Sequence, residues 1–98
     1  MSNPLTPEGP TDQPPLHQPG GDAEQAREMV ERVIDEYNAR LLAARRDPGR
    51  YAPDVVAGWR TARAQAVDDL DRLHTADEDQ TVQIALAYAA RLKELKAT

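Results

Sequence analysis

The sequence predicts an all-α protein, a three-helix up-down-up bundle behind a disordered, proline-rich N-terminal tail. Three observations predict this fold class. Apolar residues recur every three or four positions after residue 21, which is the period of an amphipathic helix. No segment alternates apolar and polar residues as a half-buried strand does. Two short breaks divide the periodic part into three, and connections of a few residues place consecutive helices antiparallel.

Residues 1–21 differ in composition from the rest of the chain. They contain six of the eight prolines, three of the five glycines and no lysine or arginine. Such a segment buries too little apolar surface to offset the entropy lost on ordering. We therefore expect a disordered leader over residues 1–21 and a helical domain over residues 22–98. Three of its prolines recur every third residue, which favours polyproline II and leaves two readings open, an inert leader or a docking peptide.

The first helix is predicted over residues 22–46. Asp22 and Gln25 have the spacing of a capping box, in which each side chain accepts from the other residue's backbone N–H. Pro48 cannot continue a helix, and Gly49 accepts the left-handed conformation that often ends one. The apolar face consists of Ala26, Val30, Val33, Tyr37, Leu41 and Ala44.

The second helix is predicted over residues 53–74, because Pro53 suits the first helical position. Gly58, Ala62 and Ala66 are four residues apart and predict a smooth stripe where a neighbouring helix approaches closely. The apolar face consists of Val55, Trp59, Ala62, Ala66, Leu70 and Leu73.

The third helix is predicted over residues 76–96. Thr75 and Glu78 have capping-box spacing, and the acidic residues 77–79 suit a helix N-terminus. If the break near Thr75 does not form, the second and third helices fuse, and the open hairpin that results must dimerise.

Composition excludes several classes of protein. The 98 residues include no cysteine, so the chain has no disulfide, thiol nucleophile or Cys-ligated metal. No signal peptide is visible, and the longest uncharged stretch, residues 80–90, is too short to span a bilayer. The net charge of −5 argues against nonspecific nucleic-acid binding. We therefore expect a cytoplasmic protein that contacts no membrane, with nucleic acid an unlikely partner.

No pattern of catalytic or cofactor-binding residues is present. Glycine-rich phosphate loops, HExxH and EF-hand loops are all missing. Asp71 and His74 have the spacing of half a metal-binding pair, but one carboxylate and one imidazole do not close a site. We expect no cofactor, no metal and no enzymatic activity.

The apolar arc of the third helix is wide. Its apolar residues cover about 200° of the helical wheel, whereas a helix that faces one core usually has an apolar stripe of about 100–140°. The excess is expected to contact a second copy or a partner protein, although a bundle that buries the whole arc remains an alternative. The interface candidates are Ile84, Tyr88, Leu92 and Leu95.

Arginines gather in one part of the chain. Residues 40–63 hold six arginines against two aspartates, while residues 68–79 hold six acids against one arginine. An up-down-up bundle places these segments at opposite ends. Arg63 falls within the apolar arc of its helix, which leaves two interpretations open. The arginine either has a structural role, stacked on Trp59 or in a salt bridge, or it binds an anion or a partner. The candidates for anion or partner binding are Arg63, Trp59, Arg40, Arg45 and Arg46.

These features favour a small noncatalytic protein–protein interaction module, an adaptor, inhibitor or accessory subunit that acts as a homodimer or bound to a partner. One alternative is a DNA-binding regulator of helix-turn-helix type, although the acids at residues 77–79 would repel phosphates at the start of the reading helix. A further alternative is a small all-helical enzyme that binds an anionic substrate through Arg40 and Arg63.

Overall fold

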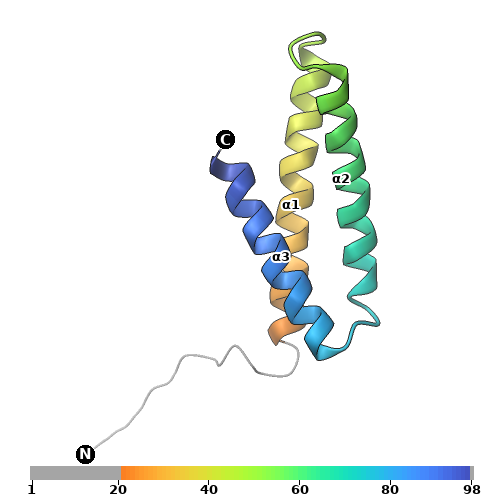
Figure 1. Cartoon of the computed structure of the whole chain (residues 1–98), viewed down its shortest axis with the longest axis vertical. Helices are drawn as coiled ribbons and strands as arrows, with labels where there is room; N and C mark the ends of the chain where they lie inside the picture. Colours follow the sequence, from red (N-terminus) through yellow and green to blue (C-terminus); the bar gives the residue numbers. More distant parts are fainter. Residues whose placement is uncertain (1–20, 98) are drawn as a thin grey trace, which may run out of the picture.

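The computed structural model describes residues 21–97, which form three helices in up-down-up order (Figure 1). The predicted fold class is confirmed. The predicted leader lies outside the described residues except for Gly21, and so does Thr98. The helices are α1 (Gly21–Arg46), α2 (Pro53–Arg72) and α3 (Glu78–Ala97).

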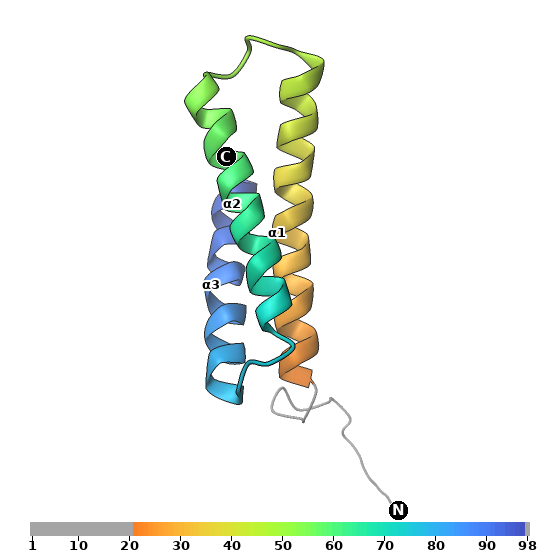
Figure 2. The same ribbon diagram turned by 90° about the vertical axis from the view of Figure 1, so that its right-hand side faces the viewer.

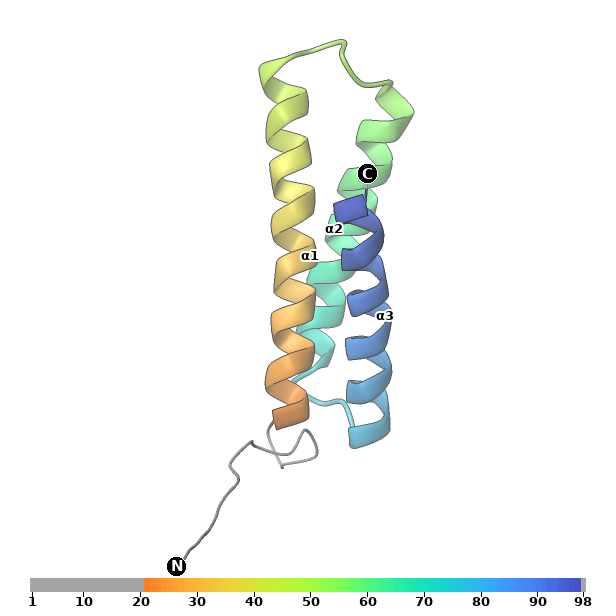
Figure 3. The same cartoon turned by 90° about the vertical axis from the view of Figure 1, so that its left-hand side faces the viewer.

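Helix α1 is the central element of the bundle. Both other helices pack along it, whereas α2 and α3 approach each other much less. Helix α3 starts beside the end of α2, crosses α1 obliquely and ends below the connection between α1 and α2 (Figures 1, 2 and 3). The part of the α1–α2 hairpin nearest this connection is therefore not covered by α3.

The core lies on one face of α1. Ala26, Val30 and Val33 are fully buried there, at spacings of four and three residues that keep them on one side of the helix. Tyr37 extends this row by one turn. Ala66 from α2 and Tyr88 from α3 complete the buried set. Partly buried side chains surround it, namely Met29, Ile34, Trp59, Ala62, Leu70, Leu73, Ile84, Leu92 and Leu95.

The bounds of α1 agree with the prediction to within one residue, whereas the role expected of Asp22 differs. The helix begins at Gly21, so Asp22 lies in the first turn, and the expectation that it caps the helix is wrong. An acid in the first turn still interacts favourably with the helix dipole. The helix ends at Arg46 as predicted, and Gly49 adopts the expected left-handed conformation, with φ of 92°.

The break between α2 and α3 forms, so the fused-helix alternative is wrong. Helix α2 ends at Arg72, two residues before the predicted end, and the Thr75 hydroxyl donates to the Arg72 carbonyl over 3.5 Å. The capping box uses a different pair from the one expected. The Gln80 N–H donates to Asp77 Oδ1 over 2.8 Å, and the Asp77 N–H donates to Gln80 Oε1 over 3.0 Å. Aspartate and glutamine make the same reciprocal contacts as the expected threonine and glutamate, but two residues farther along the chain.

The predicted close approach along the small residues of α2 does not extend to Gly58. Ala66 is buried, but a Cβ added at Gly58 would meet nothing within 4 Å. The physical reason is that α2 and α3 separate toward the beginning of α2 (Figure 1). They leave a groove of about 600 Å³, lined by Gly58, Thr61, Ala62, Gln65, Asp69, Ala87, Tyr88 and Arg91.

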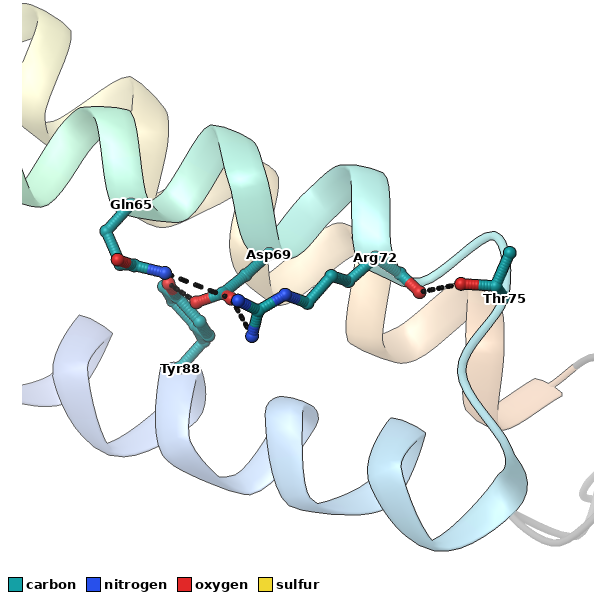
Figure 4. A network of polar contacts seen from close by, with 5 residues as sticks. All are labelled: Gln65, Asp69, Arg72, Thr75 and Tyr88. Carbon is teal, nitrogen blue, oxygen red and sulfur yellow. Dashed lines mark hydrogen bonds and ion pairs between the residues drawn. The ribbon is translucent and has the colours of Figure 1, made fainter.

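A polar network links α3 to α2 across this groove (Figure 4). The Tyr88 hydroxyl donates to Asp69 Oδ2 over 2.5 Å. The other oxygen of this carboxylate accepts from Gln65 over 3.3 Å and lies 3.4 Å from the Arg72 guanidinium. Burial and the neighbouring carboxylate both raise the pKa of Tyr88, because they disfavour the phenolate. Asp69 thus collects contacts from two helices.

Polar contacts also hold α3 on α1. Arg91 donates to the Tyr37 hydroxyl over 3.0 Å, and Lys96 lies 3.4 Å from the Glu36 carboxylate. Arg40 of α1 donates to the carbonyl oxygen of Leu95 over 2.7 Å. These contacts lie on the last two turns of α3, beside Leu92 and Leu95, which pack partly buried against the core.

Candidate functional site: a basic groove between α1 and α2

A groove runs between α1 and α2 toward the 47–52 connection. It consists of a hollow of about 550 Å³ and an adjoining one of about 290 Å³, which share Leu41, Arg45 and Arg60. We call the two together the basic groove. The larger hollow is lined by Asn38, Leu41, Leu42, Arg45, Arg60 and Arg63, and the smaller adds Ala44, Gly49, Tyr51 and Val56.

Helical spacing on both helices builds this groove. On α1, Asn38, Leu41 and Arg45 are three and four residues apart and share one face. On α2, Val56, Arg60 and Arg63 have the spacing of four and three residues. The two rows face each other because the short connection makes the helices antiparallel.

The groove carries positive charge that no acidic side chain in its lining neutralises. Arg45 and Arg60 are exposed, and within residues 21–97 neither forms an ion pair. Arg63 donates through Nε to Asn38 Oδ1 over 2.5 Å, and a neutral amide leaves the charge of the guanidinium in place. Three arginines therefore face a groove whose lining contains neither carboxylate nor imidazole.

Apolar side chains line the same groove. Leu41 and Val56 are half-buried between the helices, and Leu42 is 41% exposed at the margin. An exposed large apolar side chain beside arginines provides surface that a partner can remove from water. The groove thus offers both charge and apolar area.

The charge reverses farther along the same face of the hairpin. Another hollow, of about 520 Å³, lies toward the beginning of α1, and its charged lining consists of Glu24, Arg27 and Glu31, with Arg27 paired to Glu24. On α1, every seventh residue from Glu24 through Glu31 and Asn38 to Arg45 lies on this face. The face therefore carries one acid in excess at one end, through Glu31, is neutral in the middle and is basic at the other end.

The structure separates the five predicted anion-binding or partner-binding residues. Arg45 and Arg63 line the basic groove. Arg40 and Trp59 lie inside the bundle, where the Arg40 guanidinium sits 5.8 Å from the Trp59 ring centroid. Of the readings left open for Arg63, stacking on Trp59 is wrong, since Arg40 lies over that ring. Arg46 is exposed at the end of α1 and does not line the groove.

Arg60 and Asn38 line the groove but are not among the predicted binding residues. Arg60 belongs to the arginine-rich segment, and it precedes Arg63 by three residues, which places both on one helix face. That spacing is the signal in the sequence. Asn38 gives no comparable signal, because its position in the groove depends on how α1 and α2 are rotated about their axes where they pack together.

The expected interface residues of α3 face inward. Tyr88 is buried, and Ile84, Leu92 and Leu95 pack partly buried against the core. The exposed large apolar residues of α3 are instead Val82 and Leu86, with exposed fractions of 38% and 67%. The width of the apolar arc does not define which part of it faces α1, because that depends on how the helix is rotated about its axis.

Comparison with protein-family models, curated proteins and solved structures finds no match to this chain. None of the helices in residues 21–97 has the length and apolar character needed to cross a membrane. The same residues contain no cluster of three side chains suited to hold a metal ion.

Proposed function

We propose that this protein is a noncatalytic interaction module that binds an acidic segment of a partner protein in the basic groove. The observation that carries the proposal is the placement of Arg45, Arg60 and Arg63 around one hollow with no carboxylate in its lining. Guanidinium groups bind carboxylates in a bidentate geometry, so several of them favour a segment with several acids.

The apolar part of the groove supports a peptide as the ligand. Leu41, Leu42 and Val56 provide surface that an amphipathic helix can cover, as helices do in grooves between two other helices. A DNA backbone binds through its phosphates and has no apolar side chain to place against Leu41, Leu42 and Val56. The missing carboxylate and imidazole in the lining support binding rather than catalysis.

The sign change along the face predicts the orientation of the ligand. An amphipathic helix with acids at one end and bases at the other matches Arg45 and Arg60 at the basic end and Glu31 at the acidic end. The partner helix would complete a four-helix arrangement on the side of the α1–α2 hairpin away from α3.

Peptide selection on the immobilised full-length chain tests this proposal. A random library of helical length should yield peptides that combine aspartate or glutamate with leucine or isoleucine, with affinities that fall as salt rises. Arg60→Glu should weaken binding of these peptides at least about tenfold, since it places a like charge in the groove. Arg46→Glu makes the same charge change outside the groove and serves as the matched control.

Two results would overturn the proposal. One is a selection that enriches basic or uncharged peptides. The other is equal loss of binding in the Arg60→Glu and Arg46→Glu variants, which would show that net charge alone drives binding.

A further inference from the structure

The outer side of α3 carries a row of exposed residues with symmetric spacing. The row lies on the side of the helix opposite the buried Tyr88. We call this row the outer stripe, and its members are Asp79, Val82, Leu86, Ala90 and Lys93. Successive members are three, four, four and three residues apart, so the spacing is symmetric about Leu86.

The centre of the outer stripe is apolar. Leu86 is 67% exposed, the highest value among the exposed large apolar side chains of residues 21–97, and Val82 lies one turn before it. Ala90 lies one turn after it and is exposed and small, so another helix can come close there. An exposed leucine flanked by valine and alanine along one helix face is typical of a helix–helix contact.

The ends of the outer stripe carry opposite charges. Asp79 lies seven residues before Leu86 and Lys93 seven residues after it, each about 10 Å away along the axis at a rise of about 1.5 Å per residue. Neither forms an ion pair within residues 21–97. In an antiparallel pair whose two Leu86 residues lie opposite each other, Asp79 of each copy lies level with Lys93 of the other. The pair therefore contains two contacts between opposite charges. A parallel copy would set like charges side by side.

From this arrangement we infer that α3 pairs with α3 of a second copy, antiparallel, around a two-fold axis at Leu86. A two-fold axis requires a self-complementary surface, and the outer stripe is self-complementary in residue spacing and in charge. The charge of the whole bundle agrees, because the antiparallel pair brings the acidic end of one copy toward the basic end of the other. This surface lies on α3, whereas the basic groove lies on α1 and α2, so the inference stands apart from the proposed function.

Sedimentation of the full-length chain over a range of concentrations tests the inference. A reversible dimer is expected, and Leu86→Glu should raise its dissociation constant at least about tenfold, because it places two like charges at the axis. Val67→Glu introduces the same charge at an apolar residue of α2 that is 41% exposed, and it should leave dimerisation unchanged. A monomer at every concentration, or equal effects of the two variants, would overturn the inference.

Charge reversal tests the ends of the outer stripe. Asp79→Lys or Lys93→Asp alone should weaken the dimer, and the double variant should restore it, because the two opposite-charge contacts form again with exchanged signs. Circular dichroism of each variant establishes that the helices are intact. Dimerisation that is unchanged in both single variants would exclude the charge pairing.

Cysteine cross-linking tests the orientation, since the natural chain contains no cysteine. Antiparallel helices centred on Leu86 bring Val82 of one copy level with Ala90 of the other. A mixture of the Val82→Cys and Ala90→Cys variants should form disulfide-linked heterodimers, while Val82→Cys alone should link poorly. Efficient linking of Val82→Cys to itself would indicate parallel helices and would overturn the inference.

Discussion

The Tyr88 hydroxyl of α3 donates a hydrogen bond of 2.5 Å to the Asp69 carboxylate of α2. These two helices approach each other far less than either approaches α1. The contact therefore sets how α3 lies relative to α2, and it does so from a buried tyrosine to a carboxylate whose side chain is only 15% exposed.

Removal of this hydroxyl should destabilise the bundle. We expect Tyr88→Phe to lower the free energy of unfolding by about 1–2 kcal/mol, since hydrogen bonds to charged groups contribute more than neutral ones. Urea unfolding followed by circular dichroism measures the change. Tyr51→Phe is the control, because the Tyr51 ring contacts Trp59 but its hydroxyl makes no hydrogen bond within residues 21–97. Equal stability of the two variants would show that the Tyr88 hydroxyl contributes nothing.

The same contact predicts a pH dependence. The pKa of Tyr88 is raised in the folded chain, mainly by burial and then by Asp69, from an ordinary value near 10. Its stabilising contribution is complete below about pH 10 and is lost as the pH rises, because the unfolded chain releases the proton first. The stability difference between the natural chain and Tyr88→Phe should therefore be constant from about pH 8 to pH 10 and shrink above it. A difference that grows above about pH 10 would contradict the raised pKa.

Arg40 of α1 contacts both α2 and α3, so its replacement should lower the stability of the whole bundle. It donates to the Leu95 carbonyl and lies over the Trp59 ring. Arg40→Met should cost about 2 kcal/mol, because the charged hydrogen bond and the cation–π contact are both lost. Fluorescence of Trp59, the single tryptophan, should change together with stability. Arg46→Met, at an exposed position, should change neither, and similar losses in both variants would assign the effect to charge alone.

Gly49 and Gly58 should respond to alanine in opposite directions. A Cβ at Gly58 meets nothing within 4 Å, so Gly58→Ala should stabilise the bundle by about 0.5–1 kcal/mol through better helix propensity. Gly49 has φ of 92°, a conformation that alanine adopts only with strain. Gly49→Ala should therefore destabilise by about 1 kcal/mol. Thermal unfolding measures both, and a loss of stability in Gly58→Ala would indicate a close neighbour at that position.

Local sequence determined the elements of this protein. Apolar periodicity defined three helices, and Pro48, Gly49 and Pro53 marked the break between the first two, because proline and glycine constrain the backbone whatever surrounds them. The buried row on α1 also follows from periodicity alone. The cap of α3 was displaced by two residues, since Thr75 and Asp77 both begin a valid capping pattern and local sequence does not rank them.

Only the tertiary structure decided which residue meets which. On the sequence alone, Glu36 is an i,i+4 partner for Arg40, but in the bundle Glu36 pairs with Lys96 and Arg40 reaches Leu95. Likewise the outward side of α3 is centred on Leu86 rather than Tyr88. The physical reason is the rotation of each helix about its axis. That rotation is set by packing against α1, and it depends on contacts between residues far apart in the chain, which periodicity within one helix does not encode.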